Sequence, residues 1–133
     1  MRESDAASVL IVIPTLNEAA NLEGVVGELR SVRPADQVLV VDDASSDGTP
    51  ALARRLGCAV LELPFHLGYG AAVQTGIKYA LRRGYACVVT FDADGQHDAG
   101  DVEGLVAGVR DGLDLVLGSR RLDARSHRSG PPR

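Results

Sequence analysis

The stretch VVTFDADGQH, residues 88–97, combines an apolar run of strand type with two carboxylates one residue apart and an amide shortly after them. Alternate residues of an extended chain point the same way, so Asp92 and Asp94 converge on one cation if this geometry continues past Phe91. Carboxylate and amide oxygens are the ligands of Mg²⁺ and Mn²⁺, and Mg²⁺ is often bound together with substrate phosphates. The stretch therefore predicts a metal site for a phosphate-bearing substrate. The alternative is a solvated turn that closes a strand.

Length and composition favour an ordinary globular domain. A chain of 133 residues fits one domain, with 45% hydrophobic and 24% charged residues. The net charge of −4 does not favour a nucleic-acid partner. No apolar run approaches the roughly 20 residues that cross a bilayer, and the first five residues are too polar for a signal peptide. We therefore expect a cytoplasmic protein.

The two cysteines lie in apolar, strand-like segments. Neither Cys58 nor Cys87 has a histidine or a second cysteine nearby in the sequence. We interpret both as small buried hydrophobic residues rather than zinc ligands.

Short apolar runs alternate with amphipathic helical patterns, which is typical of a βαβ series. We expect Asn17 to cap the first helix and Pro50 to occupy the first turn of the second. The patterns predict an α/β fold with a mostly parallel sheet of about five strands and helices on both faces. The expected strands are 9–13, 37–41, 58–63, 86–91 and 113–117, and the expected helices are 18–32, 49–57, 69–83 and 101–111.

Polar residues gather where such a sheet binds its ligands. In open α/β sheets, the ligand site lies beyond the carboxyl ends of the strands. Asp42 and Asp43 stand out, because adjacent like charges repel unless other groups pair with them. Converging polar groups at strand ends predict one binding site. The polar segments that follow the predicted strands are 14–18, 42–48, 92–94 and 118–120.

Four motifs together resemble glycosyltransferase family 2, and within it the dolichyl- or polyprenyl-phosphate sugar transferase branch. They are PTLNE (14–18), VDDASSDGT (41–49), DADGQH (92–97) and GSR (118–120). The resemblance implies a GT-A nucleotide-diphospho-sugar fold and an inverting transfer from a UDP- or GDP-sugar. It assigns residues 1–121 to the nucleotide-sugar-binding domain and leaves 122–133 as a flexible basic tail.

The resemblance also implies roles for individual residues around the donor and a Mg²⁺ or Mn²⁺ ion, with Asp92 and Asp94 as the catalytic pair. Pro14, Leu16 and Glu18 would line the nucleotide pocket, and Val41 and Asp43 would bind the base and the ribose. Asp92, Ala93 and Asp94 would contact the diphosphate and the metal, and Gln96 would complete the metal shell. Arg120 would contact the donor sugar or its phosphates.

Two residues depart from the family pattern. Leu16 stands where the branch usually has an aromatic residue. His66 stands where the wider family often has Asn, and we interpret it as a solvated loop histidine.

The acceptor side is less defined by the sequence. The acceptor segment of the family would follow residue 133, so we expect this chain to bind a nucleotide-sugar better than it transfers the sugar. The arginines of 122–133 could meet an anionic lipid-phosphate acceptor at the inner face of the membrane, through peripheral contact. A five-stranded sheet also leaves an edge that a second copy of the chain could cover.

Two other functional classes remain open at this stage. The DADG segment, residues 92–95, also resembles the nucleophile motif of haloacid-dehalogenase-type phosphatases, although that motif continues with Thr where this chain has Gln96. The second alternative is a non-catalytic nucleotide-sugar-binding module.

Overall fold

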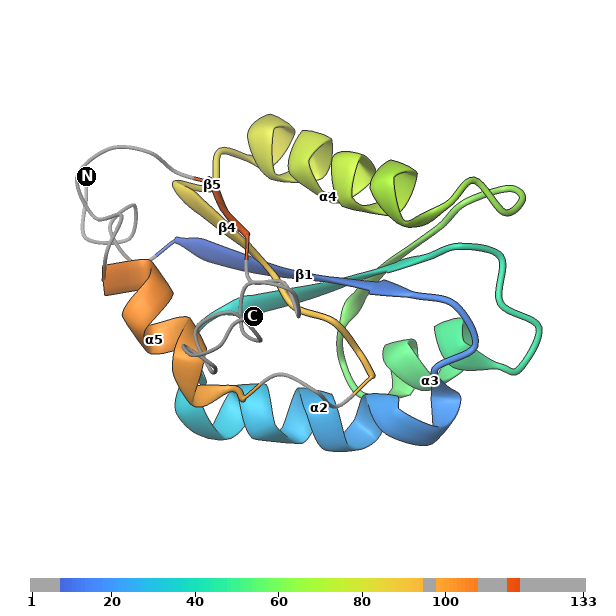
Figure 1. The fold of residues 1–133 in the computed structure, drawn as a ribbon, viewed down its shortest axis with the longest axis horizontal. Coiled ribbons are helices and arrows are strands. Elements are labelled where there is room, and N and C mark those ends of the chain that lie inside the picture. Colours follow the sequence, from blue (N-terminus) through green and yellow to red (C-terminus); the bar gives the residue numbers. More distant parts are fainter. Residues whose placement is uncertain (1–7, 95–97, 108–114, 118–133) are drawn as a thin grey trace, which may run out of the picture.

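The computed structural model describes residues 8–94, 98–107 and 115–117. Strands and helices alternate along these residues, as the sequence predicts (Figure 1). The elements are β1 (Val9–Thr15), α2 (Ala19–Val32), β2 (Gln37–Asp42), α3 (Thr49–Arg55), β3 (Ala59–Glu62), α4 (Tyr69–Arg83), β4 (Cys87–Thr90), α5 (Gly100–Ala107) and β5 (Leu115–Leu117).

The five strands form one sheet in the order β3-β2-β1-β4-β5, and every described pair is parallel. All seven residues of β1 are buried, because this strand has a neighbour on each side and helices above and below. Its continuous apolar sequence is what a strand buried on both faces requires. The predicted α/β architecture is confirmed.

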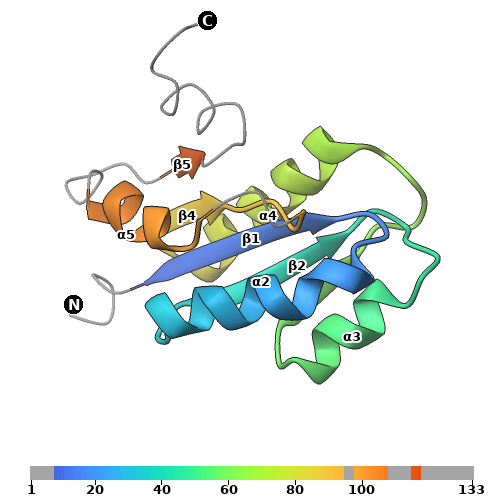
Figure 2. The ribbon, with the colours of Figure 1, turned by 60° about the horizontal axis from the view of Figure 1, so that its bottom comes forward.

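Helices cover both faces of the sheet (Figures 1 and 2). Of the described helices, α4 covers one face, and α2, α3 and α5 pack on the other. Strand periodicity separates the two cores: Ile11 and Ile13 pack on the α2 side, whereas Leu10 and Val12 pack on the α4 side.

Helix α4 lies unusually close to β1 at Gly76. A Cβ atom at this position would lie 2.5 Å from Cγ1 of Val12, which is a stiff, fully buried side chain. Glycine is therefore required for the close approach. This packing fixes the position of α4 along the sheet, so that the first residues of the helix lie beside the carboxyl end of β1 (Figure 1).

The predicted element boundaries hold within one or two residues wherever the structure describes them, and α4 matches its predicted bounds. One strand differs in a way that matters for the site: β4 ends at Thr90, before the predicted end at Phe91. The predicted end of the last helix, at residue 111, and the predicted start of the last strand, at residue 113, lie outside the described residues.

Both cysteines are free and buried, as predicted. Burial raises the pKa of the Cys58 thiol above its ordinary value. A thiol kept neutral in this way is a packing group and not a nucleophile.

Candidate functional site

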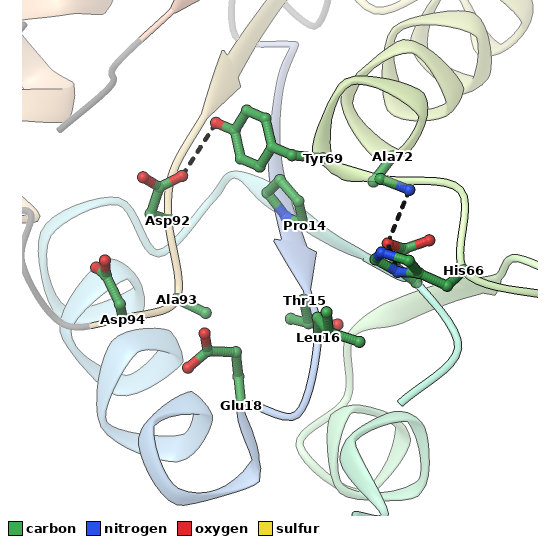
Figure 3. Close-up of a pocket in the computed structure, with 12 residues that line it drawn as sticks. Pro14, Thr15, Leu16, Glu18, His66, Tyr69, Ala72, Asp92, Ala93 and Asp94 are labelled. Atoms are coloured by element: carbon green, nitrogen blue, oxygen red, sulfur yellow. Dashed lines mark hydrogen bonds and ion pairs between the residues drawn. The ribbon is translucent and has the colours of Figure 1, made fainter. Parts of the chain in front are cut away.

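A cleft of about 460 Å³ opens at the carboxyl ends of the central strands (Figure 3). Strand β1 lies between β2 and β4, so the helices that follow β1 and precede β4 cover opposite faces there. Ligands bind at such a switch point in open α/β sheets. The cleft is lined by Pro14, Thr15, Leu16, Glu18, Asp43, His66, Gly68, Tyr69, Ala72, Asp92, Ala93 and Asp94.

One wall of the cleft is acidic. Asp92 and Asp94 are both half-buried and line the cleft, while Ala93 between them is buried. Because β4 ends at Thr90 and residues 93–94 form a turn, the two carboxylates reach the cleft through a turn and not through the strand alternation that we predicted. The hydroxyl of Tyr69, at the start of α4, donates a hydrogen bond to Oδ1 of Asp92 over 3.1 Å (Figure 3).

This wall fits a hard divalent cation. The described residues hold no group of three His, Cys, Asp or Glu side chains that could enclose a metal by themselves. Asp92 and Asp94 supply oxygen donors on an open surface, and Mg²⁺ and Mn²⁺ accept one or two carboxylates when phosphates and water complete the shell. Gln96, the third predicted ligand, lies outside the described residues.

The opposite wall is built by the ends of β1 and β2. The register pairs Thr15 with Asp42, so both side chains point to the same face of the sheet. The hydroxyl of Thr15 donates to Oδ1 of Asp42 over 2.7 Å. Ser45 adds its hydroxyl at 2.6 Å to the same oxygen and its backbone N–H at 2.8 Å to Oδ2. The buried carboxylate of Asp42 therefore has three donors.

The loops after β1 and β2 are joined by hydrogen bonds. Oδ1 of Asn17 accepts the N–H of Ser46 over 2.8 Å, and Oδ2 of Asp47 accepts the N–H of Ala19 over 3.0 Å. The prediction that Asn17 caps α2 is therefore wrong: Asp47 binds the first N–H of the helix from the other loop. Asp47 also binds Thr49, and the hydrogen bond from the Thr49 hydroxyl is the main cause that lowers the pKa of this carboxyl.

Asp43 holds the segment that leads into α4. Its carboxylate accepts the N–H of Leu67 over 2.7 Å and the N–H of Gly68 over 3.0 Å, and it pairs with Nδ1 of His66 at 2.7 Å. Gly68 has a φ of 104°, which side chains rarely adopt, so glycine allows its N–H to face Asp43. The interpretation of His66 as a solvated loop histidine agrees with its exposure, since its side chain is 62% exposed and lies outside the helices and strands, and the structure adds Asp43 as its partner.

Most predicted site residues that the structure describes meet in this cleft. Val41 is the exception: it is fully buried in the core on the α4 side, because its side chain points inward from β2. Gln96 and Arg120 lie outside the described residues. The predicted residues that line the cleft are Pro14, Leu16, Glu18, Asp43, Asp92, Ala93 and Asp94.

Sequence reasoning did not assign Thr15, His66, Gly68, Tyr69 or Ala72 to the cleft lining. The last three belong to the first turns of α4 or the residue before it. The sequence feature that points to this part of the cleft is the HLGYG segment, residues 66–70, in which one glycine precedes and one follows the first residue of the helix. The amino end of α4, with its partial positive charge, is thereby placed at the cleft.

Curated relatives match this chain over most of its length. The chain is 41% identical over 128 residues to polyprenol monophosphomannose synthase of Mycolicibacterium smegmatis, covering 92% of this chain and 48% of that protein. It is 42% identical over 119 residues to undecaprenyl-phosphate mannosyltransferase of Micrococcus luteus, covering 86% and 49%. The chain thus spans about half the length of these relatives.

Solved structures give the same fold. A mannosyltransferase of Pyrobaculum calidifontis, in complex with GDP-Man and Mn²⁺, matches 77% of this chain and 31% of its own with a TM-score of 0.62 and 32% identity. Glucosyl-3-phosphoglycerate synthase of Mycobacterium tuberculosis, with Mn²⁺ and UDP, matches 83% and 43% with a TM-score of 0.64 and 27% identity. The profile of glycosyl transferase family 2 matches residues 10–131, and the chain, with its GT-A fold, belongs to that family.

Proposed function

We propose that the cleft binds a nucleotide-sugar donor together with Mg²⁺ or Mn²⁺, and that the protein transfers the sugar to a polyprenyl phosphate. The observation that carries this proposal is the convergence of Asp92 and Asp94 with the ends of β1 and β2 in one open cleft. The two mannosyl-transferring relatives favour mannose as the sugar. One structural neighbour contains GDP-Man and another UDP-glucose, so the experiment below compares both bases.

The cleft offers complementary groups for the two parts of such a donor. Pro14 and Leu16, at the end of β1, give an apolar surface for the nucleoside, and Leu16 is 42% exposed. The amino end of α4 favours the negative charge of a diphosphate. Asp92 and Asp94 would hold the metal ion, and Gln96 and Arg120 keep their proposed roles toward metal and donor.

Charge builds up on the nucleoside diphosphate as its bond to the sugar breaks. A divalent ion, when bound, neutralises this charge. The residues of the chain would position the donor, and the hydroxyl of Tyr69 orients Asp92 by donating to one of its carboxylate oxygens. A phosphate acceptor is already anionic, so in-line attack with inversion needs little help from a general base.

A lipid-phosphate acceptor places the reaction at a membrane surface. Among the described residues, no helix is long and apolar enough to cross a bilayer. We therefore propose peripheral contact at the inner face of the membrane as the way in which the acceptor reaches the cleft. Self-association through a sheet edge stays a separate prediction, which size-exclusion chromatography with light scattering would test.

Calorimetry with GDP-mannose and UDP-glucose, each with Mn²⁺ and with EDTA, tests the donor half of the proposal. We expect one of the two to bind in the presence of Mn²⁺ and to lose most of its affinity in EDTA. Incubation with a short polyprenyl phosphate then tests transfer. Donor binding without any product would support the alternative of a binding module, whereas no binding of either donor would contradict the proposed function.

A further inference from the structure

Helix α4 carries positive charge that its own part of the chain does not balance. Lys78, Arg82 and Arg83 are exposed on the last two turns of this helix. The sequence has no aspartate or glutamate between Glu62 and Asp92, although the chain as a whole has a net charge of −4. The helix and the loop before it are therefore the basic part of an acidic protein.

These three cations have no carboxylate partner within the described part of the chain. By contrast, Arg54 at the end of α3 pairs with Glu62 at 2.7 Å. Lys78 and Arg82 are four residues apart on one face of α4, where like charges repel. The negative end of the helix dipole favours cations in the last turn, but Lys78 lies before that turn. An anion from outside the chain would offset the repulsion.

The three cations line a second groove, of about 320 Å³, between α4 and β3. It shares no lining residue with the cleft at the carboxyl ends of the strands. Leu61 of β3 and the ring of Tyr79 give it an apolar part, and the guanidinium carbon of Arg83 lies 4.5 Å from the centre of that ring. The groove thus offers positive charge beside apolar surface.

Exposed apolar side chains gather in the same part of the chain. Among the described residues, the exposed large hydrophobic residues are Leu16, Val32, Phe65, Leu67, Tyr69 and Leu81, and the last four belong to α4 or the loop before it. Leu81 is 74% exposed and adjoins Arg82 in the sequence. No described element covers α4 on the side away from the sheet (Figure 1). Cations and exposed apolar groups on one helix are typical of a surface that contacts anionic lipid headgroups.

We propose that the outer face of α4, with Lys78, Arg82 and Arg83, docks the protein on a membrane surface of anionic phospholipids. This inference rests on the proposed lipid-phosphate acceptor and names the surface through which the chain meets the membrane. Tyr69, at the amino end of α4, lines the cleft, so a bilayer that lies along this helix also reaches the mouth of the cleft. The negative net charge favours a lipid surface over a nucleic acid as the partner.

Two charge-matched variants test the proposal. Arg82→Gln/Arg83→Gln removes two positive charges from α4, and Arg54→Gln/Arg55→Gln removes two from α3, on the opposite face of the sheet. All four side chains are exposed, so both variants should unfold close to the urea concentration of the wild type. Residues 122–133, with their arginines, are the same in both. Any difference in lipid binding therefore reports on the two faces and not on net charge.

Cosedimentation with vesicles of phosphatidylcholine and phosphatidylglycerol at low salt measures the binding. We expect the α4 variant to bind about 10- to 30-fold more weakly than the wild type, as for the loss of two cations near an anionic surface, and the α3 variant to bind nearly as well as the wild type. Vesicles of phosphatidylcholine alone, or high salt, should remove most of the wild-type binding.

Three results would overturn the inference: no binding of the wild type to the anionic vesicles, wild-type affinity in the α4 variant, or equal weakening in both variants. Binding of an RNA oligonucleotide that the α4 variant loses, without vesicle binding, would assign the face to a nucleic acid instead. Calorimetry with GDP and UDP in Mn²⁺ keeps the proposed function separate, because nucleotide affinity should be the same in all three proteins. Absence of nucleotide binding contradicts the proposed function, whereas the vesicle results decide the docking surface.

Discussion

Two acidic pairs lie at the ends of β2 and β4, on either side of β1, and the structure uses them in opposite ways. Asp42, the last residue of β2, and Asp43, which follows it, are only 1% and 4% exposed, and each accepts hydrogen bonds from several donors of the protein. Asp92 and Asp94, after β4, are half-buried and line the open cleft. The first pair organises the loops around the cleft, whereas the second presents oxygen atoms to it.

The difference originates in spacing. Adjacent residues of a strand point to opposite faces, so Asp42 meets Thr15 on the α2 side while Asp43 meets the segment before α4 on the other. The mutual repulsion of the two charges is thereby offset by separate sets of donors. Asp92 and Asp94 are separated by the buried Ala93, which leaves both carboxylates at the same cleft. One shared cation is the natural partner of the second pair.

The same isosteric change should have very different effects on stability at the two pairs. Asp42→Asn replaces a charged acceptor with an amide whose NH₂ group must face either a hydroxyl or the N–H of Ser45. Hydrogen bonds to charged groups contribute about 1.5–3 kcal/mol each, so we expect a loss of roughly 2–4 kcal/mol in the free energy of unfolding. Urea denaturation measures it. A loss below 1 kcal/mol would contradict the claim that the hydrogen bonds to Asp42 stabilise the loops around the cleft.

A smaller loss is expected when Asp42 keeps its charge but loses one donor. Thr15→Val preserves shape and removes the hydroxyl that donates to Asp42 over 2.7 Å. Ser45 still satisfies both oxygens, so we expect a loss of about 1–2 kcal/mol. Thr15→Ser, which keeps the hydroxyl, is the control and should stay closer to wild type. Denaturation curves for the two variants that coincide would contradict this role of Thr15.

A third prediction concerns pH and the loop that Asp47 joins to α2. Hydrogen bonding from Thr49 lowers the pKa of Asp47 below its ordinary value of 3.8, so the ionised form is favoured in the folded state. The resulting stability is present above that value and is lost as the pH falls through the lower pKa of the folded state. The melting temperatures of the wild type and Asp47→Ala should therefore differ near pH 7, and the difference should shrink as the pH falls below 3.8. A difference in melting temperature that does not change with pH would contradict this role of the ionised Asp47 carboxylate.

The sequence was a good guide wherever a local pattern determines structure. The stripe of Leu22, Val25, Val26 and Leu29 on α2 is buried as its spacing requires, and α4 has its predicted bounds. The parallel sheet follows from the alternation of apolar strands and amphipathic helices.

The sequence was a poor guide where the partner of a polar group lies far along the chain. Asn17 looks like a helix cap, yet it binds Ser46, and the N–H of Ala19 goes to Asp47. His66 looks unpartnered until the sheet brings it to Asp43. No local pattern states which distant donor each of these groups meets, because the pairing depends on the strand order. The side chain of Val41 is fully buried, because a strand residue next to a motif shares the sequence context of the motif but not its exposure.

The smallest expected effect on stability belongs to Asp94→Asn. The residue lines an open cleft, so the free energy of unfolding should change by no more than about 0.5 kcal/mol. The effect on metal-dependent ligand binding should be large, because the substitution removes one of the two carboxylates proposed to bind the cation. Asp94→Asn and Asp42→Asn thus form a matched pair with opposite expected results.

The most direct test of the account is calorimetric titration of a nucleoside diphosphate into the wild type and Asp94→Asn, each with Mn²⁺ and with EDTA. We predict that Mn²⁺ strengthens binding to the wild type at least tenfold and has no such effect on Asp94→Asn, while both proteins unfold at the same urea concentration. Equal affinity of the wild type in Mn²⁺ and EDTA would contradict the claim that Asp92 and Asp94 form a metal-binding wall.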